Sequence, residues 1–163
     1  MKNRPSPQPK GFSLVELLLV VAVLAILAVN VMPKWPASGL NVNYQALQVL
    51  NDIRYAQALS LTTGNLYAWV KLSSNTYAIY SEGLTPIVLP NGETVATLDA
   101  NTTFGTLTNL PNSYIVFDST GTPYITSTLP MTALASTATI PLVSGSVTST
   151  VQINAVTGAG TIS

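Results

Sequence analysis

The sequence predicts an α+β protein with an N-terminal transmembrane helix, a second, amphipathic helix and a C-terminal antiparallel β-sheet domain. Three features of the 163-residue chain support this prediction. An almost uncharged apolar run covers 12–32, apolar residues recur at helical spacing between 43 and 64, and the remainder is rich in Thr, Val, Ile and Tyr with frequent turn signals. A chain of this length is expected to hold one small core, with the apolar run as an appendage.

The apolar run from Phe12 to Met32 is long enough to cross a bilayer. At about 1.5 Å per helical residue it spans roughly the 30 Å of a hydrocarbon core. Lys2, Arg4 and Lys10 precede it, so the positive-inside rule places the N-terminus in the cytoplasm and the larger C-terminal part across the membrane. A secretory signal peptide is the alternative, but the run is longer than such a segment and an acid, Glu16, lies near its start.

The segment after this run does not favour a continuous helix. Pro33, Pro36 and Gly39 predict an interrupted linker over 33–42, and the remaining 43–163 is predicted to form the globular domain. A second helix is predicted from Asn43, as its N-cap, to Gly64, as its C-terminal cap. Its apolar stripe, which is expected to face the core, consists of Ala46, Leu47, Leu50, Ile53, Ala56, Ala58 and Leu61.

Short strands are predicted from residue 66 to the C-terminus. They cover 66–72, 77–80, 114–117, 123–125 and 147–153, followed by a short end strand. In the fifth of these, Val147, Val151 and Ile153 are expected to share one face. The Ser/Thr/Ala-rich segment 126–146 is predicted to be a long loop with a short strand at 140–143.

The composition excludes several chemical functions. Apolar residues make up 47% of the chain and charged residues 7%, a composition too hydrophobic for a disordered chain. Cysteine and histidine are both absent, which removes disulfides, thiol nucleophiles, the commonest metal ligand and the commonest general base. Beyond the apolar run, three basic residues stand against five acidic ones, so no basic surface for nucleic acid is expected. We therefore expect no enzyme activity, no cofactor and no metal site.

Two stretches allow other interpretations. FDSTG, at 117–121, is similar to the Asp-Ser-Gly of aspartic proteases, but an extra residue separates acid from glycine and no second copy supplies the paired carboxylate. A hairpin turn is the favoured interpretation. Trp35, Trp69 and the tyrosines could form an adhesive face, although the position of Trp35 just beyond the apolar run indicates interfacial anchoring.

The stretch GFSLVE, residues 11–16, lies between a basic leader and an apolar helix. It resembles the processing and methylation motif of type IV pilins and type II secretion pseudopilins. The resemblance implies that a prepilin peptidase/N-methyltransferase removes 1–11 by cutting between Gly11 and Phe12, and then methylates the new Phe12 amine. Pro33 is similar to the helix-interrupting proline that pilins often carry at about this distance from the cleavage site.

The position of Glu16 has a physical interpretation beside this resemblance. Glu16 lies four residues after Phe12, one turn along the same helical face. A charge within a membrane helix costs about 2.5–3.5 kcal/mol, so the carboxylate should be paired or buried against protein. The resemblance implies that it pairs in a filament with the Phe12 amine of a neighbouring subunit. The alternative is a first-turn glutamate that only complements the helix dipole.

The stretches DIRYAQALSLTTGN, at 52–65, and VQINAVTGAG, at 151–160, are similar to the GspH/FimT-like branch of minor pilins and pseudopilins. This resemblance implies a pilin-like fold and a structural subunit, minor pilin or pseudopilin, of a type IV pilus or type II secretion-like filament. Its implied partners are other pilin subunits and, before assembly, inner-membrane lipid, in which the chain is single-pass with its N-terminus in the cytoplasm. After assembly it lies in a pilus or periplasmic pseudopilus.

One departure from that branch bears on nucleic acid. Many members carry a basic residue after the terminal Thr-Gly, where this chain has Ala159, so nucleic acid is not expected as a partner. The alternative function is a membrane-tethered adhesin or DNA-capture module that uses the apolar helix only as a tether.

Overall fold

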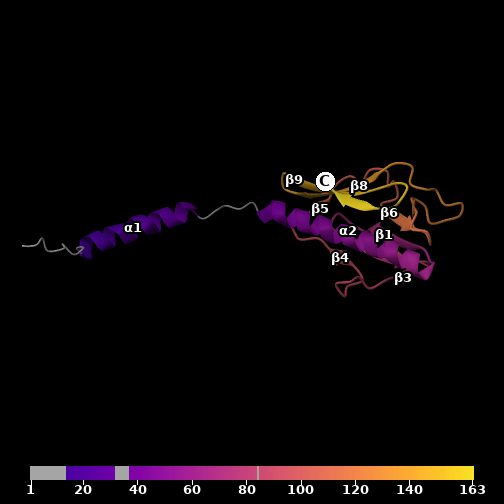
Figure 1. The fold of residues 1–163 in the computed structure, drawn as a ribbon, viewed down its shortest axis with the longest axis horizontal. Helices are drawn as coiled ribbons and strands as arrows, with labels where there is room; N and C mark the ends of the chain where they lie inside the picture. The colour runs from indigo at the N-terminus through magenta and orange to yellow at the C-terminus, as the bar shows by residue number, and fades with distance from the viewer. Residues whose placement is uncertain (1–13, 32–36, 84) are drawn as a thin grey trace, which may run out of the picture. The chain divides into compact units, whose positions relative to one another are not determined.

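The chain forms two compact units, 1–35 and 36–163. The computed structural model describes residues 14–31, 37–83 and 85–163. Helix α1 (Leu14–Val31) belongs to the first unit, whereas helix α2 (Ala37–Thr63) and the strands belong to the second (Figure 1). Helix α1 covers most of the helix predicted at 12–32, whose two ends lie outside the described residues. Among the helices of the described part, none has the combined length and apolarity to cross a membrane.

Helix α2 begins earlier than the sequence predicted and ends where it predicted. It starts at Ala37 and not at Asn43, so 37–42 are helical and the predicted linker over 33–42 is wrong for these residues. Gly39 lies in the first turn, where backbone N–H groups need no acceptor within the helix, so it does not interrupt α2. At the other end Gly64 has a φ of 76° and donates its N–H to the Ser60 carbonyl at 3.0 Å, which is the predicted cap.

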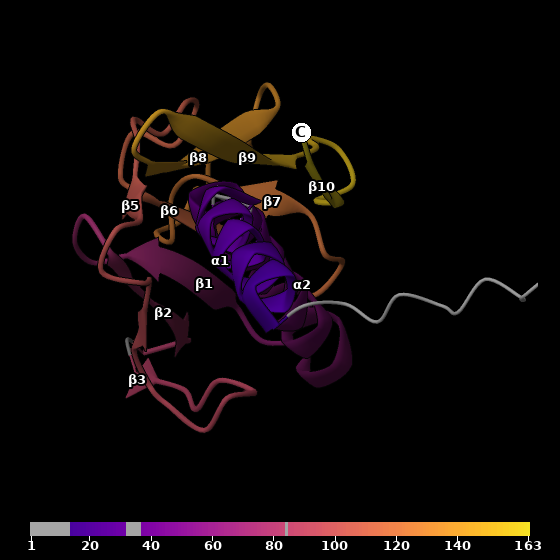
Figure 2. The same cartoon turned by 90° about the vertical axis from the view of Figure 1, so that its left-hand side faces the viewer.

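The strands form two antiparallel sheets. The first has the order β3-β2-β1-β6-β7 with β4 also on β2, and the second has the order β10-β9-β8-β5. The first sheet consists of β1 (Tyr67–Lys71), β2 (Thr76–Ser81), β3 (Thr85–Pro86), β4 (Ala96–Thr97), β6 (Tyr114–Phe117) and β7 (Pro123–Tyr124). The second consists of β5 (Thr103–Phe104), β8 (Ala138–Ser144), β9 (Val147–Ile153) and β10 (Gly160–Ile162). Helix α2 packs against strands of both sheets (Figure 2).

The hydrophobic core lies between α2 and the two sheets, and its described members all come from residues between 42 and 162. The core stripe predicted on the helix is right for Ala46, Leu50, Ile53 and Ala56. It is wrong at three positions, Leu47, Ala58 and Leu61, which are exposed, whereas Val42 and Val49 are buried. The α2 residues that face the sheets therefore form a stripe rotated slightly from the predicted one, because a helix held between two sheets buries the residues that face both.

Strand β8 extends beyond the strand predicted at 140–143 by two residues at its start and one at its end. The segment 126–146 was predicted as a loop with a strand at 140–143, but β8 runs from Ala138 to Ser144 and pairs along its length with β9. Pro141 is tolerated because its carbonyl accepts the Gly105 N–H at 2.8 Å on the side of β5, a strand of only two residues (Thr103–Phe104). The backbone N–H that proline lacks would therefore have pointed towards β5, which is too short to offer it a regular pairing partner.

The other predicted strands are confirmed within a residue or two. Strand β6 turns through 119–121 into β7, and the alternate residues of β9 after Val147 are buried. Asp118 closes the β6–β7 turn: its Oδ1 accepts hydrogen bonds from the Thr120 N–H, the Thr120 hydroxyl and the Thr122 N–H at 2.7–2.9 Å. Partial burial raises the pKa of Asp118, but these hydrogen bonds outweigh it and hold the pKa below its usual value. FDSTG is therefore the hairpin turn that the sequence favoured.

Candidate assembly site

Helix α1 is apolar on every side. Glu16 and Asn30 are its only polar residues, and the described side chains, 14–24, are all exposed within the chain. Leu14, for example, is 80% exposed and Leu17 is 64% exposed. A helix without a polar face is stable where apolar groups surround it on all sides. Helix α1 is therefore suited to be covered by lipid or by other protein chains.

Glu16 is the one charged side chain of this helix. It is exposed and lies in the first turn, where an acid complements the partial positive charge of the helix N-terminus. Gly11, Phe12 and Pro33 lie outside the described residues, so the cleavage site, the methylated amine and the helix-interrupting proline stay predictions.

Helix α2 holds the β6–β7 turn and the segment that leads from β9 into β10 through a pair of polar side chains. Arg54 donates from Nη2 to the Gly160 carbonyl at 2.8 Å. Gln57 donates from Nε2 to the carbonyls of Gly121 and Thr157, each at 2.9 Å. Apart from Gly121, these residues belong to the RYAQ and TGAG stretches, which lie far apart in the sequence. The three-residue spacing of Arg54 and Gln57 on one helix face was the only sequence signal for this contact. It does not identify the backbone carbonyls to which they donate.

Two glycines allow this close approach. A Cβ on Gly158, whose φ is +67°, would lie 2.6 Å from Gln57 Nε2 and 2.8 Å from the Gly121 carbonyl oxygen. A Cβ on Gly160 would clash with the Leu50 side chain. The terminal Thr-Gly-Ala-Gly thus has a structural role, because it lets β10 pack directly against α2.

A buried hydrogen bond links α2 to the first sheet. The Tyr77 hydroxyl donates to Asp52 Oδ2 at 2.7 Å, and Tyr77 packs with Trp69 and Phe104 at ring-centroid distances of 5.6 and 6.0 Å. Burial raises the pKa of Asp52, although the Tyr77 hydrogen bond opposes this, and burial beside Asp52 raises the pKa of Tyr77 well above its usual range. Trp69 is fully buried, so it cannot belong to the adhesive face that the sequence allowed.

The raised pKa of Asp52 predicts a pH-dependent stability. The folded chain binds the Asp52 proton more tightly than the unfolded chain, so protonation of Asp52 stabilises the folded state. This stabilisation is complete below the ordinary pKa of 3.8 and is lost as pH rises through the folded pKa. Asp52→Asn keeps an acceptor for Tyr77 and should remove this loss. Tyr77→Phe takes away the hydrogen bond that lowers the pKa and should make the loss larger. Urea unfolding of both variants and the unmodified chain, from about pH 4 to 7, measures the difference; parallel pH profiles in all three would contradict it.

The comparisons with known proteins agree with these features. Residues 8–29 match the family described as the prokaryotic N-terminal methylation motif. The type IV wide pilus major component PilA4 of Thermus thermophilus is 33% identical over 122 residues, which cover 73% of this chain and 81% of that protein. Two crystal structures of the type IV minor pilin FimU of Pseudomonas aeruginosa have a TM-score of 0.52, at 12% and 11% identity. They cover 75% and 74% of this chain and 86% and 91% of FimU.

An apolar helix joined to a compact α+β unit is the architecture of a pilin-like protein. The chain belongs to the type IV pilin family, as its N-terminal stretch predicted, and it is a structural pilus subunit. The similarity to FimU confirms the pilin-like fold, and the resemblance to the GspH/FimT-like branch fits it. Pilins are made as membrane-anchored precursors that are processed and assemble with other pilins into a pilus.

Proposed function

We propose that this chain is cut between Gly11 and Phe12, is N-methylated at Phe12 and assembles into a type IV pilus through α1. The observation that carries the proposal is the form of α1: an apolar surface on all sides with a single carboxylate in the first turn, within the residues that match the methylation motif. The apolar surface supplies cohesion by its removal from water or lipid. Glu16 supplies register, because its carboxylate meets the Phe12 amine of a neighbouring subunit.

The electrostatics favour such a pairing between subunits. A carboxylate among apolar helices costs several kcal/mol unless an opposite charge or hydrogen-bond donors accompany it. Cleavage creates a positively charged amine four residues before Glu16, and every subunit carries the same pair. Neighbouring subunits can therefore exchange amine and carboxylate, which makes one axial offset more favourable than the others.

The proposed partners follow from this route. A prepilin peptidase/N-methyltransferase acts on the leader on the cytoplasmic side of the bacterial inner membrane, where 12–32 anchors the precursor as a single-pass protein.

We place the assembled subunit in a pilus rather than a secretion pseudopilus, because PilA4 and FimU are both type IV pilus proteins. We also propose a minor subunit, on the resemblance to the GspH/FimT-like branch. Its copy number relative to the major pilin in sheared fibres, measured by quantitative mass spectrometry, tests this assignment.

Gly11→Ala should block removal of the leader. A glycine before the cut offers the peptidase a backbone without a Cβ, which an extended, close-fitting site requires. The membrane-bound chain should then retain residues 1–11, and its mass reports whether it does. The same substitution at Gly39, in the first turn of α2, is the control and should leave processing intact. A mature-sized product from the Gly11 variant would refute the assigned cut.

A DNA-capture function receives less support from the described residues. In 37–83 and 85–163 the basic side chains are Arg54 and Lys71. Arg54 is bonded to the Gly160 carbonyl, and Lys71 lies 5.9 Å from the centre of the Phe104 ring. Binding to phosphates requires several accessible cations, so assembly is the function we propose.

A further inference from the structure

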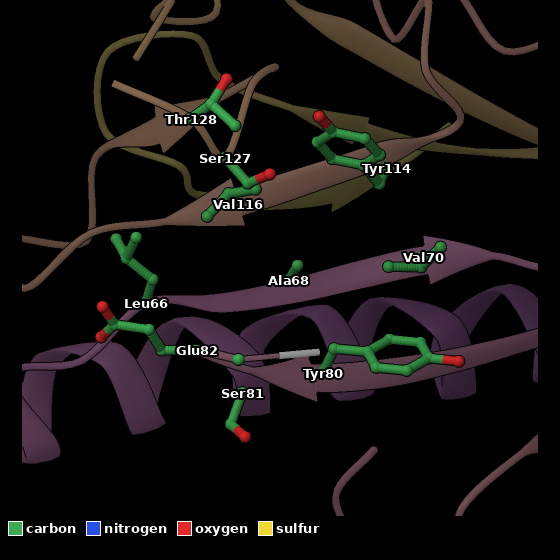
Figure 3. A pocket seen from close by; sticks show the side chains of 11 residues that line it. Leu66, Ala68, Val70, Tyr80, Ser81, Glu82, Tyr114, Val116, Ser127 and Thr128 are labelled. Atoms are coloured by element: carbon green, nitrogen blue, oxygen red, sulfur yellow. The ribbon is translucent and has the colours of Figure 1, made fainter. Parts of the chain in front are cut away.

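A pocket lies on the face of the first sheet that points away from α2. Along β1 and β6 the side chains alternate: Trp69 and Ile115 enter the core, whereas Ala68, Val70 and Val116 point to the opposite face and line the pocket. Figure 3 shows these residues with those of β2 and of the segment after β7. The cavity volume is about 340 Å³. This volume is in the lower part of the range of roughly 300–1,000 Å³ found for small-molecule pockets.

The strand register explains why a slot forms here. Ala68, on the central strand, pairs with Tyr80 on one side and Val116 on the other, and Val70 pairs with Tyr114. A small side chain between larger neighbours leaves a depression above the central strand. Adjacent strands are about 4.8 Å apart, so the two walls stand roughly 10 Å apart at the backbone. The slot therefore has an apolar floor and partly aromatic walls, wide enough for a flat ring.

The polar groups of the slot are spread around its rim. The hydroxyls of Tyr80, Tyr114, Ser127 and Thr128 and the carboxylate of Glu82 make no hydrogen bond to another side chain or backbone group in the described part of the chain. Glu82 lies beside Leu66 at one end, the two tyrosine rings lie towards Val70 at the other, and Ser127 and Thr128 lie beside β6 (Figure 3). Among the residues that the structure describes, none that lines the pocket is basic.

This arrangement selects among classes of ligand. An anion would meet the Glu82 carboxylate with no cation to offset it, which is unfavourable. A compact cation would need the carboxylate and a ring face at the same point, but they lie at opposite ends of the slot. A sugar has apolar C–H faces that can stack on tyrosine rings and hydroxyls around its edge that can reach separate rim groups.

We propose that this pocket binds a neutral carbohydrate, with the sugar ring over Ala68 and Val70, between Tyr80 and Tyr114. The Glu82 carboxylate accepts hydrogen bonds from sugar hydroxyls at one end, and the Ser127 and Thr128 hydroxyls donate and accept along one side. The site lies on the globular unit and uses no residue of α1, so it is independent of the proposed assembly route.

Saturation-transfer NMR tests the proposal with the full chain in polyoxyethylene detergent, whose head group carries no sugar. The probes are cellobiose, lactose and N,N′-diacetylchitobiose at millimolar concentration, with tetramethylammonium as the cationic comparison. We expect saturation of the ring C–H protons of at least one disaccharide. Tyr114→Ala should weaken that binding about tenfold, because a stacking ring is lost.

Two further variants separate loss of the site from loss of the fold. Ala68→Leu adds bulk to the floor without removing a core residue and should abolish binding. Tyr44→Ala removes a tyrosine that is 69% exposed on α2, outside the pocket, and should leave binding unchanged. The proposal is overturned if no disaccharide receives saturation, if tetramethylammonium binds in their place, or if Ala68→Leu and Tyr44→Ala affect binding equally.

Discussion

Replacing Gly158 with alanine should lower the free energy of unfolding of the globular unit by about 3 kcal/mol or more. A domain is held folded by only roughly 5–15 kcal/mol, so this loss is severe. The backbone is one cause: at a φ of +67°, a residue with a Cβ costs about 1–2 kcal/mol more than glycine. This backbone cost does not by itself change how the turns that contain Gly121 and Gly158 pack against α2.

The second cause is the space between α2 and the C-terminal turn. The new Cβ would lie 2.6 Å from Gln57 Nε2 and 2.8 Å from the Gly121 carbonyl oxygen, so the Gln57 side chain has to move. Gln57 then loses hydrogen bonds to the Gly121 and Thr157 carbonyls. Each is worth about 1 kcal/mol, which together with the backbone cost gives the expected loss.

Two other glycines serve as matched controls. Gly145 also has a positive φ, +61°, but a Cβ there meets no atom within 4 Å, so Gly145→Ala measures the backbone cost alone. Gly160→Ala measures the packing cost against Leu50 without a positive φ. A fragment of residues 36–163 keeps every core residue that the structure describes and has Trp69 as its one tryptophan, so urea unfolding followed by fluorescence compares all three. Equal losses for Gly158→Ala and Gly145→Ala would show that the packing argument is wrong.

The sequence was most informative where a local pattern and its structural cause coincide. Gly64 was predictable because a helix cap needs only one residue with a positive φ after the last turn. Strand β9 was predictable because alternation along seven residues reflects a strand with one buried face. The apolar run likewise carries its own signal, since no polar face interrupts it.

The errors arose where tertiary contacts decide local structure. Gly39 is a poor helix former, but its place in the first turn costs α2 little. The sequence predicted a strand across Pro141 but not the contact that accommodates it, in which the Pro141 carbonyl accepts the Gly105 N–H. Leu47 and Leu61 fit a helical stripe by spacing, but the two sheets cover a neighbouring sector of α2. None of these contacts can be read from residues nearby in the chain.

The same limit applies to the functional surfaces. GFSLVE indicated processing and assembly because a motif is local by nature. The pocket between Tyr80 and Tyr114 was not predictable, because it depends on the pairing of β1 with β6, which is distant from β1 in sequence. Asp52 was equally hidden: its burial follows from the position of Tyr77 across the core.

Glu16→Val should leave leader removal intact and reduce the yield of assembled filaments by more than about tenfold. The substitution removes the carboxylate and leaves the Phe12 amine of a neighbouring subunit among apolar helices without its partner. An uncompensated charge there costs at least about 2.5 kcal/mol, and each 1.4 kcal/mol corresponds to a factor of ten in an equilibrium. The mass of the membrane-bound chain reports cleavage, and immunoblotting of sheared fibres reports assembly.

The size of this effect separates pairing from the helix-dipole alternative. An acid that only complements the dipole of α1 contributes about 0.3–1 kcal/mol, so its loss would change assembly by no more than about fivefold. Glu16→Gln keeps the shape of the side chain but removes its charge. If the charge pairs with an amine, this variant should lower the filament yield nearly as much as Glu16→Val. Glu82→Gln, which removes an acid from the globular unit, should assemble normally. Normal fibres from the valine variant would exclude pairing as the source of register, because an apolar helix alone allows many axial offsets of similar energy.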